Sequence, residues 1–196
     1  MEYSTVILGG GESRRMGQDK RKLDWFGKPL LFQRVEAFTA CQDLVLSLRM
    51  PEVTDLPRPV RFVYDAQPDA GPMAGVSAAL TAMENEVLFV TGCDTPLVDT
   101  GTAEYLLSML GDHDAIVPVS EDGKVHPLTA VYRRCAAEKA VKLLAEGRRK
   151  MTELLKELDV VFVPGKLLPG GELTLSNLNT PEDVDHLKEM LRREEP

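Results

Sequence analysis

The sequence feature that most constrains the fold is a short apolar run that ends in three consecutive glycines. Residues 5–8 read TVIL and show no polar alternation, which is typical of a strand buried on both faces of a parallel sheet. Gly9, Gly10 and Gly11 follow at once. Because glycine has no Cβ, the chain can turn here with positive φ and bring its amide groups close to a ligand. The pattern therefore predicts an α/β fold with a ligand site where this first strand ends.

Basic side chains gather after the glycines. Between residues 14 and 28 the basic residues are Arg14, Arg15, Lys20, Arg21, Lys22 and Lys28, and the acidic ones are Asp19 and Asp24. Successive backbone amides form a concavity that binds anions, and the cations add full charges to it. A solvated basic loop that contains glycines by chance is the alternative, but the position of the glycines directly after a buried strand favours a site for a polyanion.

Two common phosphate-binding loops do not match this segment. A dinucleotide-binding loop has its third glycine where this chain has Arg14. A P-loop continues from its second glycine with Lys and then Ser or Thr, whereas Gly17 is followed by Gln18 and Asp19. The sequence therefore disfavours both an NAD site and a Walker-type ATPase.

Length and charge narrow the class of protein further. The 196 residues, 43% of them hydrophobic, are enough for a single domain with one sizeable core. The formal net charge of −8 disfavours broad binding to nucleic acid or to anionic membranes, because those surfaces would repel the chain. The sequence has neither an apolar run of membrane-spanning length nor the basic start of a signal peptide. We therefore expect a cytoplasmic protein.

Strand and helix patterns alternate along the chain. Strands are predicted at residues 5–8, 44–48, 60–64, 87–91, 115–119, 128–132 and 160–163. Helices are predicted at residues 30–38, 74–83, 102–110, 135–146 and 181–191, and residues 164–171 are predicted to form one surface loop. This alternation predicts α/β architecture in a single doubly wound domain, with a mostly parallel sheet and helices on both faces.

Two acidic residues follow predicted strands. Asp65 comes after the third strand and Asp94 after the fourth. In an open α/β sheet, ligands bind at the carboxyl ends of strands near the reversal of strand order, so both residues should lie beside the glycine loop. Asp94, with Pro96 two positions later, is placed to hold Mg²⁺ together with phosphate oxygens. An Asp that caps the following turn is the alternative.

The cysteines and histidines do not predict a metal centre. The three cysteines are an odd number at wide spacing, which gives neither a disulfide framework nor a metal knuckle. The three histidines lie too far apart in sequence to indicate a cluster of ligands. We assign none of these residues to zinc.

The glycine segment resembles a known signature. Leu8, Gly9, Gly10, Gly11, Ser13, Arg15, Met16, Gly17, Asp19 and Lys20 match the L-x-G-G-x-S-x-R-M-G-x-D-K pattern of nucleotidyltransferases, specifically of the molybdenum cofactor guanylyltransferases. The segments GPMAG at 71–75, GCDTP at 92–96, HPLTAVY at 126–132 and NLNTPED at 177–183 follow in the order of that family. The resemblance covers nearly the whole chain and implies the Rossmann-like nucleotidyltransferase fold.

The resemblance also implies an activity and its substrates. It implies transfer of GMP from GTP to the phosphate of molybdopterin or molybdenum cofactor, with release of pyrophosphate and formation of molybdopterin guanine dinucleotide. Because the reacting groups are anions that repel one another, positioning and charge neutralisation should dominate catalysis. Molybdoenzyme-specific chaperones and other proteins of cofactor biosynthesis are the implied partners. No nucleic acid and no membrane partner is expected.

Specific residues carry the implied roles. The implied catalytic residues are Arg15, Lys20 and Asp94, with Asp94 also the ligand of Mg²⁺. The implied GTP-binding residues are Leu8, Gly9, Gly10, Gly11, Ser13, Lys20, Asp65 and Asp94. The implied pterin-binding residues are His126, Arg148, Asn177 and Asn179, although charge runs are often only solvated and Asn often only forms turns. Residues 1–100 would mainly bind the nucleotide and residues 101–196 mainly the pterin.

Several alternatives stay open at this point. Some relatives have an Asn at the end of the second strand, where this chain reads Ser47, Leu48 and Arg49, so the preference for GTP over CTP is not decided. A cytidylyltransferase or a sugar-phosphate nucleotidyltransferase of the same fold is one alternative. A carrier that hands on the cofactor when nucleotide binds, without catalysis, is the other.

Overall fold

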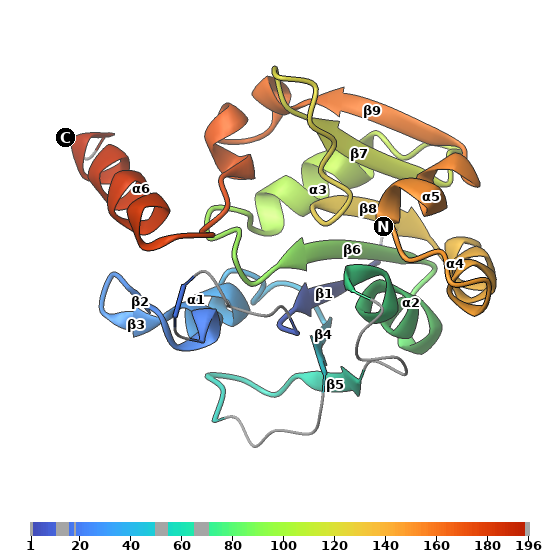
Figure 1. Cartoon of the computed structure of the whole chain (residues 1–196), viewed down its shortest axis with the longest axis horizontal. Helices are drawn as coiled ribbons and strands as arrows, with labels where there is room; N and C mark the ends of the chain where they lie inside the picture. Colours follow the sequence, from blue (N-terminus) through green and yellow to red (C-terminus); the bar gives the residue numbers. More distant parts are fainter. Residues whose placement is uncertain (1, 11–15, 18, 50–54, 65–70, 195–196) are drawn as a thin grey trace.

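The computed structural model describes residues 2–10, 16–17, 19–49, 55–64 and 71–194. They contain a seven-stranded sheet in the order β5-β4-β1-β6-β8-β7-β9 (Figure 1). Its strands are β1 (Ser4–Leu8), β4 (Asp43–Leu48), β5 (Arg61–Tyr64), β6 (Val87–Gly92), β7 (Ala115–Val119), β8 (Ala130–Arg133) and β9 (Val160–Pro164). A separate hairpin consists of β2 (Asp24–Trp25) and β3 (Lys28–Pro29). The predicted mostly parallel α/β sheet is confirmed.

The strand order reverses beside β1. This strand pairs in parallel with β4 on one side and with β6 on the other, and β4 pairs in parallel with β5. The carboxyl ends of these strands therefore meet at one edge of the sheet, where open α/β sheets bind ligands.

One strand runs against the others. β8 pairs antiparallel with both β6 and β7, whereas β7 and β9 are parallel. The sequence pattern predicts the strand but not its direction. The connection from Val119 to Ala130 is too short to hold the crossover that two parallel neighbours require, and the isolated antiparallel bridge between Val119 and Val125 shows that it folds back directly.

Helices cover both faces of the sheet. They are α1 (Leu30–Glu36), α2 (Pro72–Ala82), α3 (Thr100–Ser108), α4 (Ala136–Ala145), α5 (Met151–Lys156) and α6 (Pro181–Glu194). Buried residues of α1, α3 and α6 belong to one hydrophobic cluster and those of α2, α4 and α5 to another. Figure 1 shows α6 at one end of the molecule and α4 with α5 at the other.

The sheet separates the two clusters residue by residue. Val6 lies in the cluster of α2 and Ile7 in the cluster of α1, and the same alternation runs through Leu88, Phe89 and Val90. Successive side chains of a strand point to opposite faces, and both faces are apolar here. This is why the strands read as continuous apolar runs.

Some predicted elements need correction. The helix predicted at residues 30–38 ends at Glu36, with Phe38 buried beyond it. Residues 164–171 do not form a simple surface loop, because they contain η2 (Gly165–Leu167), the start of η3 (Gly171–Leu175) and the buried Leu168. The sequence periodicity does not predict two further elements, because they are too short to show a repeat: the six-residue α5 and the turn η1 (Lys20–Lys22).

None of the described helices combines the length and the apolar character needed to cross a membrane.

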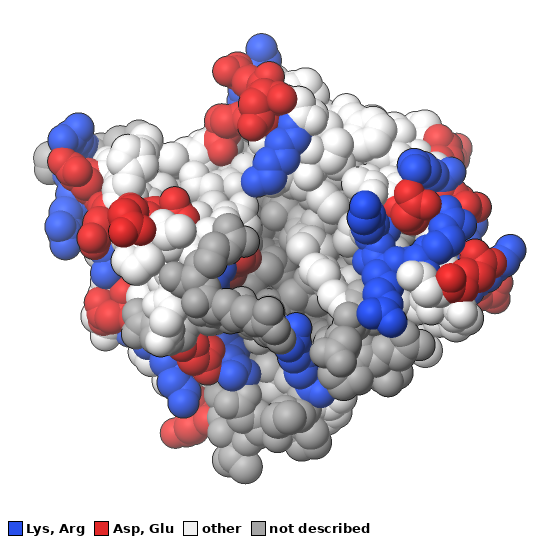
Figure 2. Space-filling model, viewed as in Figure 1, with Lys and Arg blue, Asp and Glu red and all other residues white. Residues whose placement is uncertain are grey.

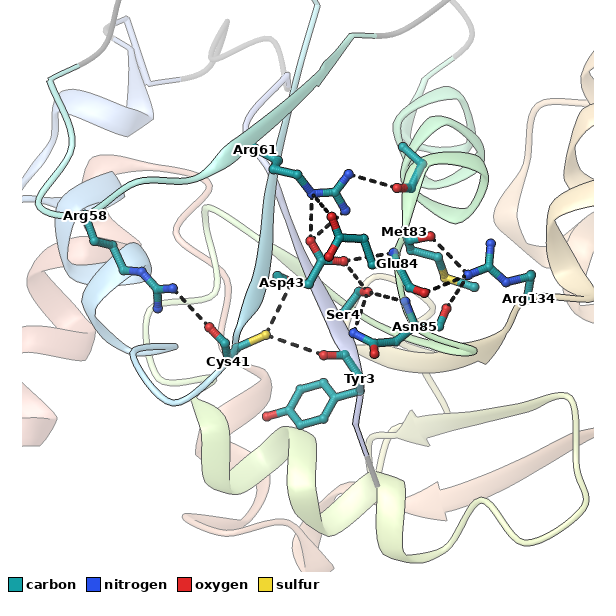
Figure 3. A network of polar contacts seen from close by, with 11 residues as sticks. Tyr3, Ser4, Cys41, Asp43, Arg58, Arg61, Met83, Glu84, Asn85 and Arg134 are labelled. Carbon is teal, nitrogen blue, oxygen red and sulfur yellow. Dashed lines mark hydrogen bonds and ion pairs between the residues drawn. The ribbon is translucent and has the colours of Figure 1, made fainter.

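A network of polar side chains closes the amino edge of the sheet (Figure 3). Asp43 accepts hydrogen bonds from Arg61 Nε at 2.8 Å and Nη2 at 2.6 Å, from the Glu84 amide at 3.1 Å, and from the Ser4 hydroxyl. Burial works against ionisation of this carboxyl, but the hydrogen bonds from Ser4, Glu84 and Arg61 keep its pKa below the usual value. The network joins β1, β4 and β5 to the segment before β6.

Candidate functional site

The first part of the site is the backbone that leaves β1. The Cys93 amide donates to the Leu8 carbonyl at 3.1 Å, and the Gly9 amide donates to the Ser47 carbonyl at 2.9 Å. A Cβ on Gly9 would lie 3.1 Å from Leu48 Cδ2, so glycine allows the chain to pass close to β4. The expected positive φ is absent at Gly9, and in this segment it occurs among the described residues at Gly17, with φ 64°. Close approach, rather than a left-handed turn, explains Gly9.

Asp94 stands at the carboxyl end of β6. Its side chain is 30% exposed, and its backbone carbonyl accepts a hydrogen bond from the Leu178 amide at 2.8 Å. A Cβ on Gly92 would lie only 2.5 Å from Asp94 Oδ1, so any other residue here would force the Asp94 carboxylate to move. Gly92 therefore leaves the space into which the Asp94 carboxylate turns.

Lys20 joins three distant parts of the chain. Its Nζ donates to Asp94 Oδ2 at 3.2 Å and to Asn179 Oδ1 at 3.0 Å. The preceding Asp19 caps the short η1 turn by accepting from the Arg21 amide at 3.0 Å, which helps to fix the backbone at Lys20. The structure thus brings Lys20, Asp94 and Asn179 together at the carboxyl edge of the sheet.

Asn179 is held by the start of α6. The Asn179 and Thr180 amides donate to Asp183 Oδ2 at 2.9 and 2.8 Å, and the Asp183 amide donates to Thr180 Oγ1 at 3.2 Å. These reciprocal bonds form a capping box. Burial opposes ionisation of Asp183, but the two amides, the Thr180 hydroxyl and the charge of Lys20 lower its pKa. The cap therefore fixes the backbone that presents Asn179 to Lys20.

A cavity of about 490 Å³ opens beside Asp94. Its lining from the first half of the chain is Pro72, Gly92, Asp94 and Thr95, and its lining from the second half is Lys124, Val125, His126, Pro127, Leu128, Thr129, Arg149, Lys150, Met151, Thr152 and Asn177. In the space-filling view this face is hollowed near its centre, with a group of Lys and Arg side chains to the right (Figure 2). The cavity thus combines one carboxylate with three cations, hydroxyl groups and apolar surface.

His126 forms part of the cavity wall. The residue is 8% exposed, its amide donates to the Pro118 carbonyl at 2.9 Å, and its Nε2 contacts the Ser120 hydroxyl. Burial, with the nearby Lys124 charge, lowers the pKa of this imidazole from its ordinary value of 6.5. The ring is therefore neutral at pH 7 and is suited to hydrogen bonding and contact rather than to holding an anion by charge.

The basic run after α4 is divided in two. Arg148 Nη2 pairs with Glu153 at 2.6 Å, and Arg148 Nη1 lies 3.6 Å from both Glu146 and Glu157. Arg149 and Lys150, in contrast, line the cavity. Of the two predicted asparagines, Asn177 lines the cavity and Asn179 contacts Lys20.

The predicted set of site residues and the observed set differ in two ways. Gly11, Ser13, Arg15 and Asp65 lie outside the described residues. The sequence analysis did not select Lys124, Thr129 or Thr152 of the cavity, although Thr129 stands within the HPLTAVY segment. Neither did it select Arg34, which is buried beneath the Asp94 loop. Position 34 follows Leu30 by four residues, on the buried face of α1, and this spacing was the available signal.

The site residues can be compared with the ligands that a metal ion requires. Among the described residues no group of three or more His, Cys, Asp or Glu side chains could hold a metal ion. Mg²⁺ does not need such a cage, because it commonly takes one or two carboxylates and completes its shell with substrate phosphates and water. The partly exposed Asp94 carboxylate, in the space left by Gly92, fits a site of that kind.

Comparisons with known proteins show the family of this chain. Residues 5–161 match the family model described as the MobA-like NTP transferase domain. A protein of Bacillus velezensis named "Probable molybdenum cofactor guanylyltransferase" is 32% identical over 191 residues, which cover 95% of each chain. A protein of Methanosarcina acetivorans with the same name is 34% identical over 201 residues, covering 94% of this chain and 89% of the relative.

Solved structures show the same fold. The molybdopterin-guanine dinucleotide biosynthesis protein A of Archaeoglobus fulgidus superposes with a TM-score of 0.81 at 26% identity, covering 97% of this chain and 99% of that one. The 2-C-methyl-D-erythritol 4-phosphate cytidylyltransferase of Thermus thermophilus superposes with a TM-score of 0.71 at 20% identity, covering 98% of this chain and all of the other. At that identity the second likeness is one of fold alone.

Proposed function

This chain belongs to the MobA-like NTP transferase family, and we propose that it transfers GMP from GTP to the terminal phosphate of molybdopterin or molybdenum cofactor. A phosphate oxygen of the acceptor attacks the α-phosphorus of GTP, and a new P–O bond forms. The bond from the α-phosphorus to the bridging oxygen breaks, and pyrophosphate leaves with its electron pair. The observation that carries the proposal is the contact of Lys20 with Asp94 and Asn179 beside a cavity with three further cations.

The nucleotide would lie over the end of β1. The backbone of Leu8, Gly9 and Gly10 would approach the base and ribose, with Gly11, Ser13 and Arg15 completing the phosphate site. Lys20 would neutralise charge on the α-phosphate and on the leaving group, because a preorganised cation stabilises charge that develops in the transition state. Its Nζ is 3.2 Å from the Asp94 carboxylate, so substrate phosphate would compete with that contact.

Asp94 would hold Mg²⁺. A metal ion at this position would supply charge neutralisation to the phosphates of the bound nucleotide. Asp94 itself contributes a carboxylate whose direction is set by Gly92 and whose backbone is set by Leu178. No protein nucleophile is needed, so the chain's own work is to position two anionic substrates and to reduce their repulsion.

The acceptor would occupy the cavity. Its volume of about 490 Å³ lies in the range of small-molecule sites. Lys124, Arg149 and Lys150 are placed to attract the acceptor phosphate, and Thr129 and Thr152 offer hydroxyl groups. His126 would present a neutral ring, and Asn177 an amide. Most of this lining lies after residue 100, which supports a division of labour between residues 1–100 and residues 101–196.

Arg148 is the weakest of the proposed pterin contacts. It is engaged with Glu153, and the hydrogen bonds from Lys156 and Arg148 lower the pKa of that carboxyl to about 2. Contact with the pterin would require Arg148 to leave this pair. Guanine selection by Asp65, a cytoplasmic location and molybdoenzyme chaperones as partners belong to the same proposal.

Pyrophosphate release tests the activity directly. The purified protein is incubated with Mg²⁺, molybdopterin and either GTP or CTP, and pyrophosphate and dinucleotide are measured together. We expect both products with GTP and at least tenfold less with CTP. Greater turnover with CTP would make the protein a cytidylyltransferase. Nucleotide binding without any pyrophosphate would favour the carrier and overturn the proposal.

A further inference from the structure

Arg34 is a charged side chain in the hydrophobic core. It is 1% exposed, and its guanidinium carbon lies 5.3 Å from the centre of the Phe38 ring. Arginine is rarely buried to this extent unless it is paired, because removing a charge from water is unfavourable. A role for the cation should therefore be visible in its contacts.

Its contacts go to one loop. Arg34 Nη1 donates to the Pro96 carbonyl at 3.2 Å and also to the Val98 carbonyl. These carbonyls belong to the segment that leaves β6 and carries Asp94. Within the part of the chain that the structure describes, no carboxylate forms an ion pair with Arg34, and its Nε has no hydrogen-bond partner. The side chain is thus used to hold backbone rather than to balance a buried acid.

A chain of hydroxyl groups reaches the same loop from its other end. Arg34 Nη2 donates to Thr91 Oγ1 at 3.1 Å, and Thr91 Oγ1 lies 3.1 Å from Thr95 Oγ1. Thr95 Oγ1 in turn donates to the Gly92 carbonyl at 2.9 Å. The guanidinium therefore fixes the backbone both before and after Asp94.

The charge of Arg34 persists at neutral pH. Burial lowers the pKa of the guanidinium to about 10, while the nearby carboxylates of Asp99 and Asp94 act in the opposite direction. Burial also raises the pKa of the Cys93 thiol to about 12, so this neighbour stays neutral. Arg34 is therefore a cation beneath residues 92–98 at neutral pH.

We propose that Arg34 is a positioning residue for nucleotidyl transfer, which fixes residues 92–98 so that the Asp94 carboxylate faces the substrate phosphates. The inference rests on the proposed role of Asp94. Arg34 itself is not among the residues that line the cavity. Its effect is transmitted through the Thr91 and Thr95 hydroxyls and the Pro96 and Val98 carbonyls.

Arg34→Met tests the proposal, because Met keeps much of the apolar volume and removes every hydrogen bond. In the metal-free protein we expect faster amide exchange in residues 92–98 than in the rest of the sheet. In the assay we expect the Mg²⁺ concentration for half-maximal activity to rise, and kcat to fall, each by about tenfold, the scale of losses when groups that orient a metal ligand are removed. Arg34→Lys should recover part of both effects.

A matched control separates positioning from stability. Arg134 also holds backbone carbonyls, donating to Met83 at 3.0 Å and to Asn85 at 2.7 Å at the opposite edge of the sheet. Arg134→Met should lower the melting temperature without changing the Mg²⁺ dependence. A folded Arg34→Met protein with wild-type Mg²⁺ dependence and wild-type exchange in residues 92–98 would overturn the proposal.

Two further variants cover the remaining outcomes. If Arg34→Met does not fold, Thr91→Val tests the inference instead, because it removes only one hydroxyl. It should raise the Mg²⁺ concentration for half-maximal activity severalfold, and an unchanged value would refute the inference.

The double variant Arg34→Lys with Asp94→Asn should be no less active than Asp94→Asn alone, because Arg34 acts through Asp94. An Asp94→Asn protein with full activity would defeat the proposed role of Asp94, on which this inference rests. A wild-type protein that releases no pyrophosphate would defeat the proposed function itself, and normal Mg²⁺ dependence in Arg34→Met alone would defeat only the role of Arg34.

Discussion

The two edges of the central sheet use the same chemical groups in opposite ways. At the amino edge, Asp43 is 5% exposed, and both of its oxygens are taken by Arg61, Ser4 and the Glu84 amide. At the carboxyl edge, the side chain of Asp94 is 30% exposed and faces Lys20 beside a cavity. The Asp43 carboxylate has no capacity left to bind a ligand, whereas the Asp94 carboxylate can still bind one.

The difference lies in the backbone that carries each acid. Asp43 begins a strand and is enclosed by β1, β5 and the segment before β6, as Figure 3 shows. Asp94 follows a strand, in a loop that Gly92 opens and Arg34 supports. A buried, fully bonded acid stabilises the fold, whereas an exposed acid on a rigid loop can exchange a protein partner for a substrate.

The largest expected contrast comes from changing each acid to its amide. Asp94→Asn should reduce kcat/KM by about 10³-fold through loss of charge at the phosphates, with little change in the free energy of unfolding. Asp43→Asn should destabilise the protein by about 2–3 kcal/mol, because hydrogen bonds to a charged group are weakened, while activity per folded molecule stays at the wild-type level. Urea denaturation and steady-state kinetics on both variants measure this. Equal kinetic losses in both would show that the edges are not functionally distinct.

The second contrast concerns two glycines. Gly92→Ala places a Cβ 2.5 Å from Asp94 Oδ1, so the carboxylate must move, and we expect about a 10²-fold loss in kcat, as for small misplacements of reacting groups. Gly101→Ala is the matched control, because its Cβ would lie 3.4 Å from Asp99 Oδ1 in ordinary contact. That variant should keep wild-type kinetics. A fully active Gly92→Ala protein would mean that the orientation of Asp94 is unimportant.

The third contrast concerns the cap that presents Asn179. Asp183→Ala removes the acceptor of the Asn179 and Thr180 amides and should destabilise α6 by about 1 kcal/mol. Because the backbone at Asn179 loosens, we also expect a severalfold loss of activity. Glu182→Ala removes a neighbouring acid of the same first turn and should affect neither. Thermal melts and initial rates separate the two variants, and unchanged rates in Asp183→Ala would remove Asn179 from the site.

Much of this arrangement could be read from local pattern. The apolar runs predict the strands because both faces of each central strand are buried, and the positions of Lys20 and Asp94 after strands predict that they meet. Their roles in catalysis stay predictions. The direction of β8 was not predictable from periodicity, since connection length decides it.

The support beneath the site could not be predicted in the same way. Arg34 lies on the apolar face of a helix. Only the folded structure shows that its guanidinium donates to two loop carbonyls and to a threonine hydroxyl. The same holds for Arg61, whose acid partner precedes it by 18 residues and lies on the neighbouring strand. Polar contacts between residues distant in sequence depend on the tertiary structure, which local sequence patterns do not predict.

The smallest expected effect is on the pH dependence of stability, which Asp43 at the amino edge should control. The pKa of Asp43 is lower in the folded protein than its ordinary value of 3.8, so its stabilising effect is complete above that value and is lost as pH falls through the lower, folded one. Stability of the wild type should therefore fall between pH 4 and the acid limit of folding, and Asp43→Asn should show a shallower fall. Urea titrations at pH 3, 4 and 6 measure the slopes. Parallel slopes in both proteins would mean that Asp43 is not the acid that couples folding to protons, and the amino edge would then need another explanation for its stability.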